Sequence, residues 1–348
     1  MTGGEFSAEP KLTSVLRRVP PLGHVRFRSA RGQEGDVCLF ELPEDASPIA
    51  LEAPTGRMMT VAPGDTFLAV PGCRESIRWA SGRIPTGGLV PRDPYWVIAD
   101  SGIVGELTGE PPAKVGYFGR VRYLGAACGD GGETLNIRQF AVREDAGRDR
   151  GAPVYLIVGT CGNIGKTTAG IAVLRSLRMQ RRVPVIALKA TGTSSFEEIA
   201  RYRDFGAVQA FDSIDFGLPT TFPSSRESVA GFFDEMLDFC LAQPADALVA
   251  ECGGDLFGAS VPEFLACLKP RRPDLKVVLT APDALAAIGA KQVLTGIGLE
   301  ITLITGPCTD TPTLRERTEA LCGVPAINLA RSADQGKQSV LSSLAAPA

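Results

Sequence analysis

The chain has 348 residues, of which 44% are hydrophobic and 22% charged, and its formal net charge is −3. This length predicts two domains of ordinary size, each able to bury a core of its own. Because the net charge is small and no long basic run occurs, a nucleic-acid-binding surface is excluded, and we expect a small-molecule substrate.

Cysteine usage and hydropathy favour a cytoplasmic protein. The nine cysteines occur singly, with no C-x-x-C pair, which argues against a disulfide framework and against a zinc ribbon. We expect reduced thiols that serve as small hydrophobic side chains. The N-terminus lacks an apolar signal core, and no stretch of about 18 apolar residues is present to span a bilayer, so we expect no membrane contact.

The N-terminal part of the chain is predicted to be an arm followed by a β-rich domain. Residues 1–20 are mainly polar and are expected to form a flexible arm. Over residues 21–142, short β-rich runs alternate with Gly and Pro turns, which is typical of a small all-β barrel or sandwich. The expected strands include residues 24–28, 36–40, 66–70, 95–99 and 114–118.

The C-terminal part has a different pattern. Residues 143–152 are charged, lack large apolar side chains and are expected to be a linker. From 153 to 330 apolar runs alternate with helical segments, which predicts an α/β domain with a doubly wound parallel sheet, and 331–348 are expected to be a tail. The expected strands are 154–158, 183–188, 247–250, 276–280, 301–305 and 326–329, and the expected helices include 169–177, 228–242, 283–295 and 312–322.

A glycine-containing loop, Gly159-Thr160-Cys161-Gly162-Asn163-Ile164-Gly165-Lys166-Thr167-Thr168, lies between the first of these strands and a helix. Successive backbone N–H groups and the helix N-terminus make such a loop a phosphate cradle. Lys166 is expected to reach the β- and γ-phosphates, and the Thr167 hydroxyl to bind Mg²⁺. The residues expected to bind the cofactor are Gly162, Asn163, Ile164, Gly165, Lys166, Thr167 and Thr168.

Two further strands end in candidate catalytic side chains. Ligands of doubly wound sheets bind at the carboxyl ends of the strands. Lys189 ends the second strand and is expected to neutralise a transferring phosphoryl group, unless it is only a solvated lysine. Glu251 ends another strand, where a carboxylate commonly orders Mg²⁺; a capping role is the alternative for Glu251 and for Asp255.

Small and polar residues beside these strand ends are candidate substrate contacts. They are Thr191, Gly192 and Thr193 after Lys189, Gly253 and Gly254 after Glu251, and Asp212 and Asp215 in a segment that is alternatively a packed turn. Residues 305–311 follow the strand at which such proteins often hold the base. The Asn-Lys-x-Asp tetrad that reads guanine is missing, which favours ATP over GTP, and Asp310 is alternatively a helix cap.

The loop together with Lys189 resembles dethiobiotin synthetase and the ATP-binding half of cobyrinic acid amidating synthases. Both belong to the P-loop branch that includes MinD and the nitrogenase iron protein, in which Thr at position 160 is usual. The resemblance covers residues 153–330 and implies that Lys189 stabilises the transferred phosphate. The family's Glu-x-x-Gly-Gly run is one residue shorter here, at Glu251, which puts that residue's role in doubt.

Two looser resemblances exist. The Gly-Thr-x-x-x-x-Gly-Lys pattern is similar to that of P-loop proteins formerly of unknown function, some of which acetylate amino acids; this implies a loop that holds coenzyme A, with acetyl-CoA as the cofactor. The domain order is similar to that of some polynucleotide kinases, although the acidic charge balance speaks against an RNA substrate.

Three functions remain open from the sequence. The first is an ATP- and Mg²⁺-dependent kinase or ligase that activates a small carboxylate or amine, with Lys166, Lys189 and Glu251 as catalytic residues. The second is an acyl-CoA-dependent N-acyltransferase. The third is a nucleotide switch or metal-delivery NTPase, disfavoured because His24 is the single histidine. A homodimer is expected from the resemblance.

Overall fold

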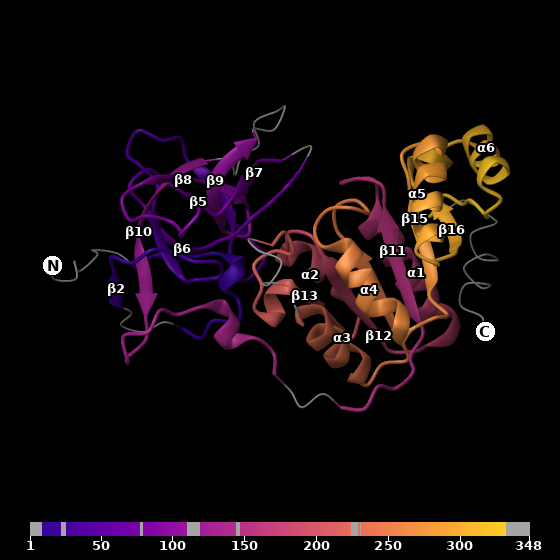
Figure 1. The fold of residues 1–348 in the computed structure, drawn as a ribbon, viewed down its shortest axis with the longest axis horizontal. Helices are drawn as coiled ribbons and strands as arrows, with labels where there is room; N and C mark the ends of the chain where they lie inside the picture. The colour runs from indigo at the N-terminus through magenta and orange to yellow at the C-terminus, as the bar shows by residue number, and fades with distance from the viewer. Residues whose placement is uncertain are drawn as a thin grey trace. The chain divides into compact units, whose positions relative to one another are not determined.

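A computed structural model describes residues 9–21, 26–76, 79–109, 119–143, 147–223, 229 and 231–331 (Figure 1). The chain forms two compact units. The first, called here the β unit, comprises Met1–Val142, Thr193–Glu197 and Ser213–Ala230. The second, the α/β unit, comprises Arg143–Gly192, Glu198–Asp212 and Gly231–Ala348.

Two segments that the sequence analysis placed within the continuous P-loop domain therefore belong to the β unit. Polar contacts inside that unit explain their place. Asp215 accepts from Arg17 Nη2 at 2.9 Å and from Arg18 Nε at 2.8 Å. Thr220 Oγ1 donates to the carbonyl of Cys73 at 2.8 Å. The partners are far apart in sequence, so local pattern gives no sign of them.

The β unit contains a small barrel. Strands β6, β3, β10, β8 and β9 pair in that order, and β9 pairs again with β6, which closes the ring. Strands β1, β2 and β7 extend it, and β4 and β5 form a separate hairpin. The strands are β1 Lys11–Leu12, β2 Arg26–Arg28, β3 Cys38–Glu41, β4 Ile49–Glu52, β5 Met58–Val61, β6 Thr66–Pro71, β7 Ser81–Arg83, β8 Pro94–Ala99, β9 Ile103–Gly109 and β10 Gly119–Cys128.

Barrel strands β3 and β6 are buried on both faces over most of their length. Successive side chains of a strand point to opposite faces. Phe40 and Phe67 pack in one apolar cluster, whereas their neighbours Leu39 and Leu68 pack in another that includes Val15. The runs with few polar residues that the sequence shows here are therefore explained by burial on both sides.

Some expectations for this part of the chain need correction. Residues 11–16, expected in a flexible arm, form β1 and a 3₁₀ helix, η1 (Ser14–Leu16), because Val15 and Leu16 are buried in the apolar core. The expected strand 24–28 is present as β2 from Arg26 onward. His24 and the expected strand 114–118 lie outside the described residues.

The α/β unit contains a six-stranded parallel sheet in the order β13-β12-β14-β11-β15-β16, which confirms the predicted α/β class. The strands are β11 Val154–Gly159, β12 Val185–Thr191, β13 Gln209–Asp212, β14 Ala247–Cys252, β15 Lys276–Thr280 and β16 Ile301–Thr305. The helices are α1 Lys166–Arg181, α2 Phe196–Asp204, α3 Phe232–Ala242, α4 Val261–Arg271, α5 Ala284–Gly296 and α6 Pro312–Cys322.

Three details differ from the sequence analysis. Strand β13 was not expected. The expected strand 326–329 is reduced to a single bridge between Ile304 and Ala326. The expected linker is tied down where it is described, since Asp149 forms an ion pair with Arg272, with Nη1 and Oδ2 2.8 Å apart.

Strand order explains where the site forms. β11, which leads into the glycine loop, lies between β14 and β15, and β12 flanks β14 on the other side. Parallel pairing sets Ile157 opposite Glu251 and Glu251 opposite Lys189. The loops that follow these strands therefore meet at the carboxyl edge of the sheet. Among the described residues, none of the helices has both the length and the apolarity needed to cross a bilayer.

Candidate functional site

The glycine loop between β11 and α1 has the backbone conformation of a phosphate cradle. Asn163 and Gly165 have φ angles of 60° and 92°, and Gly165 is the N-cap of α1. No protein acceptor within the described chain pairs with the N–H groups of Gly162, Asn163, Ile164 or Gly165. A side chain added at Gly162 or Gly165 would meet only open space. The loop therefore offers unpaired donors, beside a helix N-terminus, to an anion.

Gly159, where β11 enters the loop, has a different reason to be glycine. A β-carbon there would lie 2.6 Å from Thr280 Oγ1 and 2.8 Å from Lys166 Cδ. The Thr280 hydroxyl donates to the carbonyl of Val158 at 3.1 Å, and the carbonyl of Thr280 accepts from the N–H of Thr160 at 3.3 Å. The glycine thus lets β15 and the Lys166 stem pack against the start of the loop.

Lys166 is folded back over the loop. Its ammonium donates to the carbonyl of Cys161 at 2.6 Å and to the carbonyl of Gly254 at 2.8 Å, and the side chain is buried. Burial, with the charge of Lys189 nearby, lowers the pKa of Lys166 below its ordinary value. A buried ammonium held only by carbonyl dipoles is stabilised by any anion that enters the loop.

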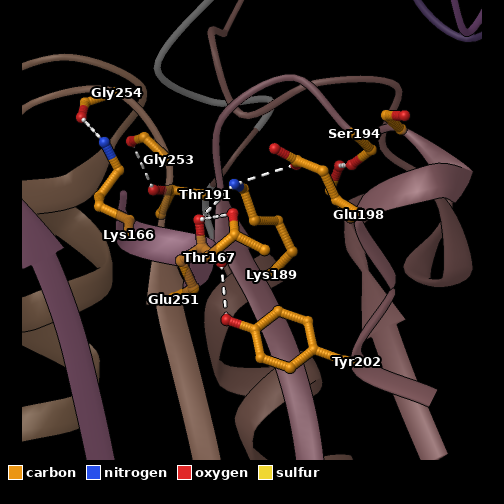
Figure 2. Close-up of polar contacts among 12 residues, drawn as sticks. Lys166, Thr167, Lys189, Thr191, Ser194, Glu198, Tyr202, Glu251, Gly253 and Gly254 are labelled. Atoms are coloured by element: carbon orange, nitrogen blue, oxygen red, sulfur yellow. Dashed lines mark hydrogen bonds and ion pairs between the residues drawn. The ribbon is translucent and has the colours of Figure 1, made fainter. Parts of the chain in front are cut away.

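Glu251, at the end of β14, joins the loop to the neighbouring strand (Figure 2). Its Oε1 accepts from Thr167 Oγ1 at 3.0 Å and from Lys189 Nζ at 2.7 Å. Lys189 also pairs with Glu198, with Nζ and Oε2 3.0 Å apart. From the sequence, Thr167, Lys189 and Glu251 were expected to lie at one edge of the sheet; in the structure, Glu251 is in direct contact with both of the other two.

Lys189 and Glu251 hold each other in the charged form. Burial by itself disfavours both charged forms. The ammonium of Lys189 nevertheless keeps the pKa of Glu251 below its ordinary value, and Glu198 and Glu251 together raise the pKa of Lys189. Glu251 is only 1% exposed. Lys166, Lys189, Glu198 and Glu251 therefore form a nearly neutral group of two cations and two anions.

Helix α2 supplies two side chains that the sequence analysis missed. Glu198 and Tyr202 are four residues apart and so lie on one face of α2. Glu198 contacts Lys189, and the Tyr202 hydroxyl donates to Glu251 Oε2 at 2.7 Å (Figure 2). The four-residue spacing can be read from the sequence. It points to the site only once the structure shows that this face of α2 lies against Lys189 and Glu251.

The candidate substrate residues divide into two groups. Thr191 Oγ1 donates to the carbonyl of Gly253 at 3.2 Å, and the N–H of Gly253 donates to the carbonyl of Thr191 at 2.9 Å, beside Gly192. These residues and Gly254 join the loops after β12 and β14, next to the lysines. Asp212 lies opposite Lys189 in the sheet register and is buried.

Thr193 and Asp215 belong instead to the β unit. Asp215 forms the ion pairs with Arg17 and Arg18, and Thr193 pairs with Thr220 through an isolated bridge. Asp255 accepts from the N–H groups of Phe257 and Gly258, both at 2.8 Å, as a loop-stabilising carboxylate does. Helix α6 is capped by Thr311, whose Oγ1 accepts from Leu314 N at 3.3 Å, rather than by Asp310.

The cysteines match the expectation of free thiols. None of the nine forms a disulfide bond, and seven of them are buried. Burial raises the pKa of Cys252, beside Glu251, to about 12, so this thiol stays protonated. Within the described residues, no group of His, Cys, Asp and Glu side chains has the arrangement of a metal-binding cluster.

Neither a protein-family model nor a curated protein sequence matches this chain. Solved structures are similar to part of it. A ParA family ATPase from Chlorobium tepidum is 13% identical over 55% of this chain and 89% of that chain, with a TM-score of 0.33. The signal recognition particle receptor FtsY from Elizabethkingia anophelis, in complex with GDP, is 14% identical over 61% and 69%, with a TM-score of 0.37.

A third structure, a DUF1611 family protein from Anabaena variabilis, is 16% identical over 60% of this chain and 64% of that chain, with a TM-score of 0.38. At TM-scores below 0.5, these similarities assign neither a family nor an activity to the chain. The functional conclusion therefore depends on the geometry of the site.

Proposed function

We propose that the α/β unit binds a nucleoside triphosphate with Mg²⁺ at the loop Gly159–Thr168 and transfers the γ-phosphate to a small carboxylate or amine. ATP is the nucleotide we favour, because the guanine-reading tetrad is missing from the sequence. The observation that carries the proposal is the hydrogen bond from the Thr167 hydroxyl to Glu251. It lies next to a loop of unpaired N–H groups and two buried lysines.

The side chains present fit a Mg²⁺-nucleotide. Thr167 donates its hydroxyl proton to Glu251, which leaves the oxygen lone pairs of Thr167 free to face a cation. A hydroxyl and a carboxylate are oxygen ligands of the kind that Mg²⁺ prefers, and Mg²⁺ supplies neutralisation of the β- and γ-phosphate oxygens when it is bound. Thr167 and Glu251 would hold it.

The two lysines would act on the phosphates. Lys166 exchanges two backbone carbonyls for phosphate oxygens, and this removes the disadvantage of its buried charge. Lys189 exchanges Glu198, which is 33% exposed, for an oxygen of the γ-phosphate, while Glu251 keeps the lysine in place. Both charges then face the group in which negative charge develops during transfer, and such preorganised charge is the main source of rate in this chemistry.

In the proposed reaction a carboxylate oxygen or an amine nitrogen of the acceptor attacks the γ-phosphorus, and an amine releases one N–H proton to solvent. The bond from that phosphorus to the bridging oxygen breaks, and its electron pair stays with the β-phosphate of the departing diphosphate. The small net charge of −3 is consistent with a small-molecule acceptor rather than a nucleic acid. A homodimer remains part of the proposal.

Calorimetric titration of the full chain with Mg-ATP, Mg-GTP and acetyl-CoA tests this function, followed by turnover of Mg-ATP with a panel of carboxylates and amino acids. We expect Mg-ATP binding and acceptor-dependent release of ADP, both lost in Lys166→Ala. Lys291→Ala is the matched control, since Lys291 also donates to a backbone carbonyl, that of Cys322 at 2.6 Å. Tight acetyl-CoA binding without nucleotide binding would refute the proposal in favour of the acyltransferase.

A further inference from the structure

Tyr202 is placed against the one carboxylate oxygen of Glu251 that the loop and Lys189 do not use. Thr167 and Lys189 both donate to Oε1, whereas Oε2 accepts from the Tyr202 hydroxyl at 2.7 Å. The tyrosine is 1% exposed, so its hydroxyl is shielded from water. In this geometry the hydroxyl is the donor and the carboxylate oxygen is the acceptor.

Helix α1 has a glycine, Gly170, where the Tyr202 hydroxyl packs against it. Gly170 lies in the first turns of α1, where a glycine costs about 1 kcal/mol relative to alanine. A β-carbon at Gly170 would lie 2.0 Å from the hydroxyl oxygen of Tyr202 and 3.0 Å from its Cζ. The glycine is thus required by the approach of Tyr202 to Glu251, beneath the helix turn that carries Thr167.

We propose that Tyr202 is a positioning residue for the metal-side carboxylate: it fixes the rotation of Glu251 so that Oε1 faces Thr167. The inference rests on the proposed function. Lys189 cannot fix this rotation alone, because Glu198 pulls the same ammonium from another side. Without the phenol donor, either oxygen of Glu251 can turn toward Lys189, and the bond to Thr167 is no longer enforced.

The test measures how strongly Mg²⁺ tightens nucleotide binding. The dissociation constant of ATP is determined by titration with Mg²⁺ and again with excess chelator, in the wild-type chain and in Tyr202→Phe. The Mg²⁺ ratio is the dissociation constant measured with chelator divided by that measured with Mg²⁺. We expect this ratio to fall about tenfold in Y202F, the usual scale for losing a hydrogen bond to a buried charged group, while the constant measured with chelator stays unchanged. A purely structural role for Tyr202 would change both constants alike or neither.

Tyr95→Phe is the matched control, because Tyr95 is also buried and its hydroxyl accepts from the N–H of Val90 at 2.7 Å in the β unit. We expect the Mg²⁺ ratio of Y95F to equal that of the wild type. Every variant is measured at a temperature at which circular dichroism shows it to be folded.

A second pair of variants examines the same claim without removing the hydroxyl alone. Gly170→Ala should displace Tyr202, lower the melting temperature and reduce the Mg²⁺ ratio. Adding Tyr202→Phe to Gly170→Ala should recover much of the melting temperature, because the closest clash is gone, but should not restore the ratio. Gly289→Ala in α5 is the control for a helical glycine, since a β-carbon there meets nothing within 4 Å.

The outcomes separate the two proposals. A wild-type chain that binds ATP equally well with and without Mg²⁺ overturns the proposed function. A wild-type chain that shows the Mg²⁺ effect, with an unchanged ratio in both Y202F and G170A, overturns the role of Tyr202 and leaves the function standing. A reduced ratio in both variants, with unchanged ratios in Y95F and G289A, supports the role.

Discussion

Replacing Lys189 with methionine removes the central cation of the site and changes its shape little. The Lys189 side chain is 7% exposed, and its ammonium contacts Glu251, whose side chain is 1% exposed. After the substitution, Glu251 keeps its bonds from Thr167 and Tyr202 but loses the charge that neutralises it. The variant therefore measures what an unpaired buried carboxylate costs in this fold.

The expected loss of unfolding free energy is large. Removing one partner of a buried ion pair typically costs about 3–5 kcal/mol. In a unit of this size each kcal/mol corresponds to about 2–4 °C in melting temperature, so Lys189→Met should lower the melting temperature of the α/β unit by roughly 6–20 °C. In the double variant Lys189→Met/Glu251→Gln, the side chain at 251 no longer carries a charge that has lost its partner, and most of the loss should be recovered.

The two units can be followed separately in the full chain. Both tryptophans, Trp79 and Trp96, belong to the β unit, whereas nearly all α-helical residues belong to the α/β unit. Tryptophan fluorescence therefore reports on the β unit and far-ultraviolet circular dichroism mainly on the α/β unit. We expect the dichroism transition of K189M to move down in temperature and the fluorescence transition to stay closer to that of the wild type.

Two results would contradict this reasoning. If K189M melts like the wild type, the carboxylate is not held ionised by the lysine. If the double variant loses as much as the sum of the two single variants, the two charges are not coupled, because coupled residues must depart from additivity.

Three other changes give distinct outcomes. Glu198→Gln should lower the free energy of unfolding by about 1 kcal/mol or less, since Glu198 is partly exposed. It should tighten ATP binding up to about fivefold, because the phosphate no longer competes with a carboxylate for Lys189. Weaker ATP binding by titration would count against the replacement of Glu198 by phosphate. Gly159→Ala should destabilise the α/β unit by about 1–3 kcal/mol through overpacking against Thr280 and Lys166, seen in the dichroism transition. Burial, followed by the charge of Glu52, raises the pKa of Asp100 above its ordinary 3.8, so the stability that this carboxyl contributes is full below pH 3.8 and is lost as the pH rises through the folded-state pKa. At neutral pH, Asp100→Asn should therefore melt a few degrees higher than the wild type in the fluorescence transition. The difference in melting temperature should vanish toward pH 3.8.

The strands of the α/β sheet, and the residues at its carboxyl edge, could be predicted from the sequence because each strand is a local apolar run. Strands β15 and β16 occur where the apolar runs place them, since strands buried on both faces are continuous apolar segments. Lys189 and Glu251 could be assigned to one edge because parallel strands all end there. The glycine loop was found from its glycines and Gly-Lys-Thr between an apolar run and a helical run, which is also a local pattern.

The remaining features depend on contacts between distant parts of the chain. Asp215 was a candidate substrate contact, with a packed turn as the alternative, but it forms an ion pair with Arg17, 198 residues away. Such a distant partner cannot be inferred from the local pattern. Segments 193–197 and 213–230 belong to the β unit for the same reason, since their partners there are distant in sequence. Gly170 did carry a usable signal, because a glycine inside a predicted helix often marks a close approach, although the sequence could not say that the approaching group is Tyr202.

The buried charges of the site are better explained by ligand binding than by stability. Replacing a buried ion pair with apolar residues of similar size is often neutral or stabilising, so Lys189 and Glu251 are not needed to hold the sheet together. What they provide is a cation already desolvated and aimed by Glu251, with a weaker, partly exposed partner in Glu198 that an incoming anion can replace. A phosphate that replaces Glu198 also releases that carboxylate beside the transferred group. If E198Q both tightens ATP binding and slows acceptor phosphorylation, the released carboxylate takes part in receiving the acceptor; if it only tightens binding, Glu198 acts solely as the counter-ion that the phosphate displaces.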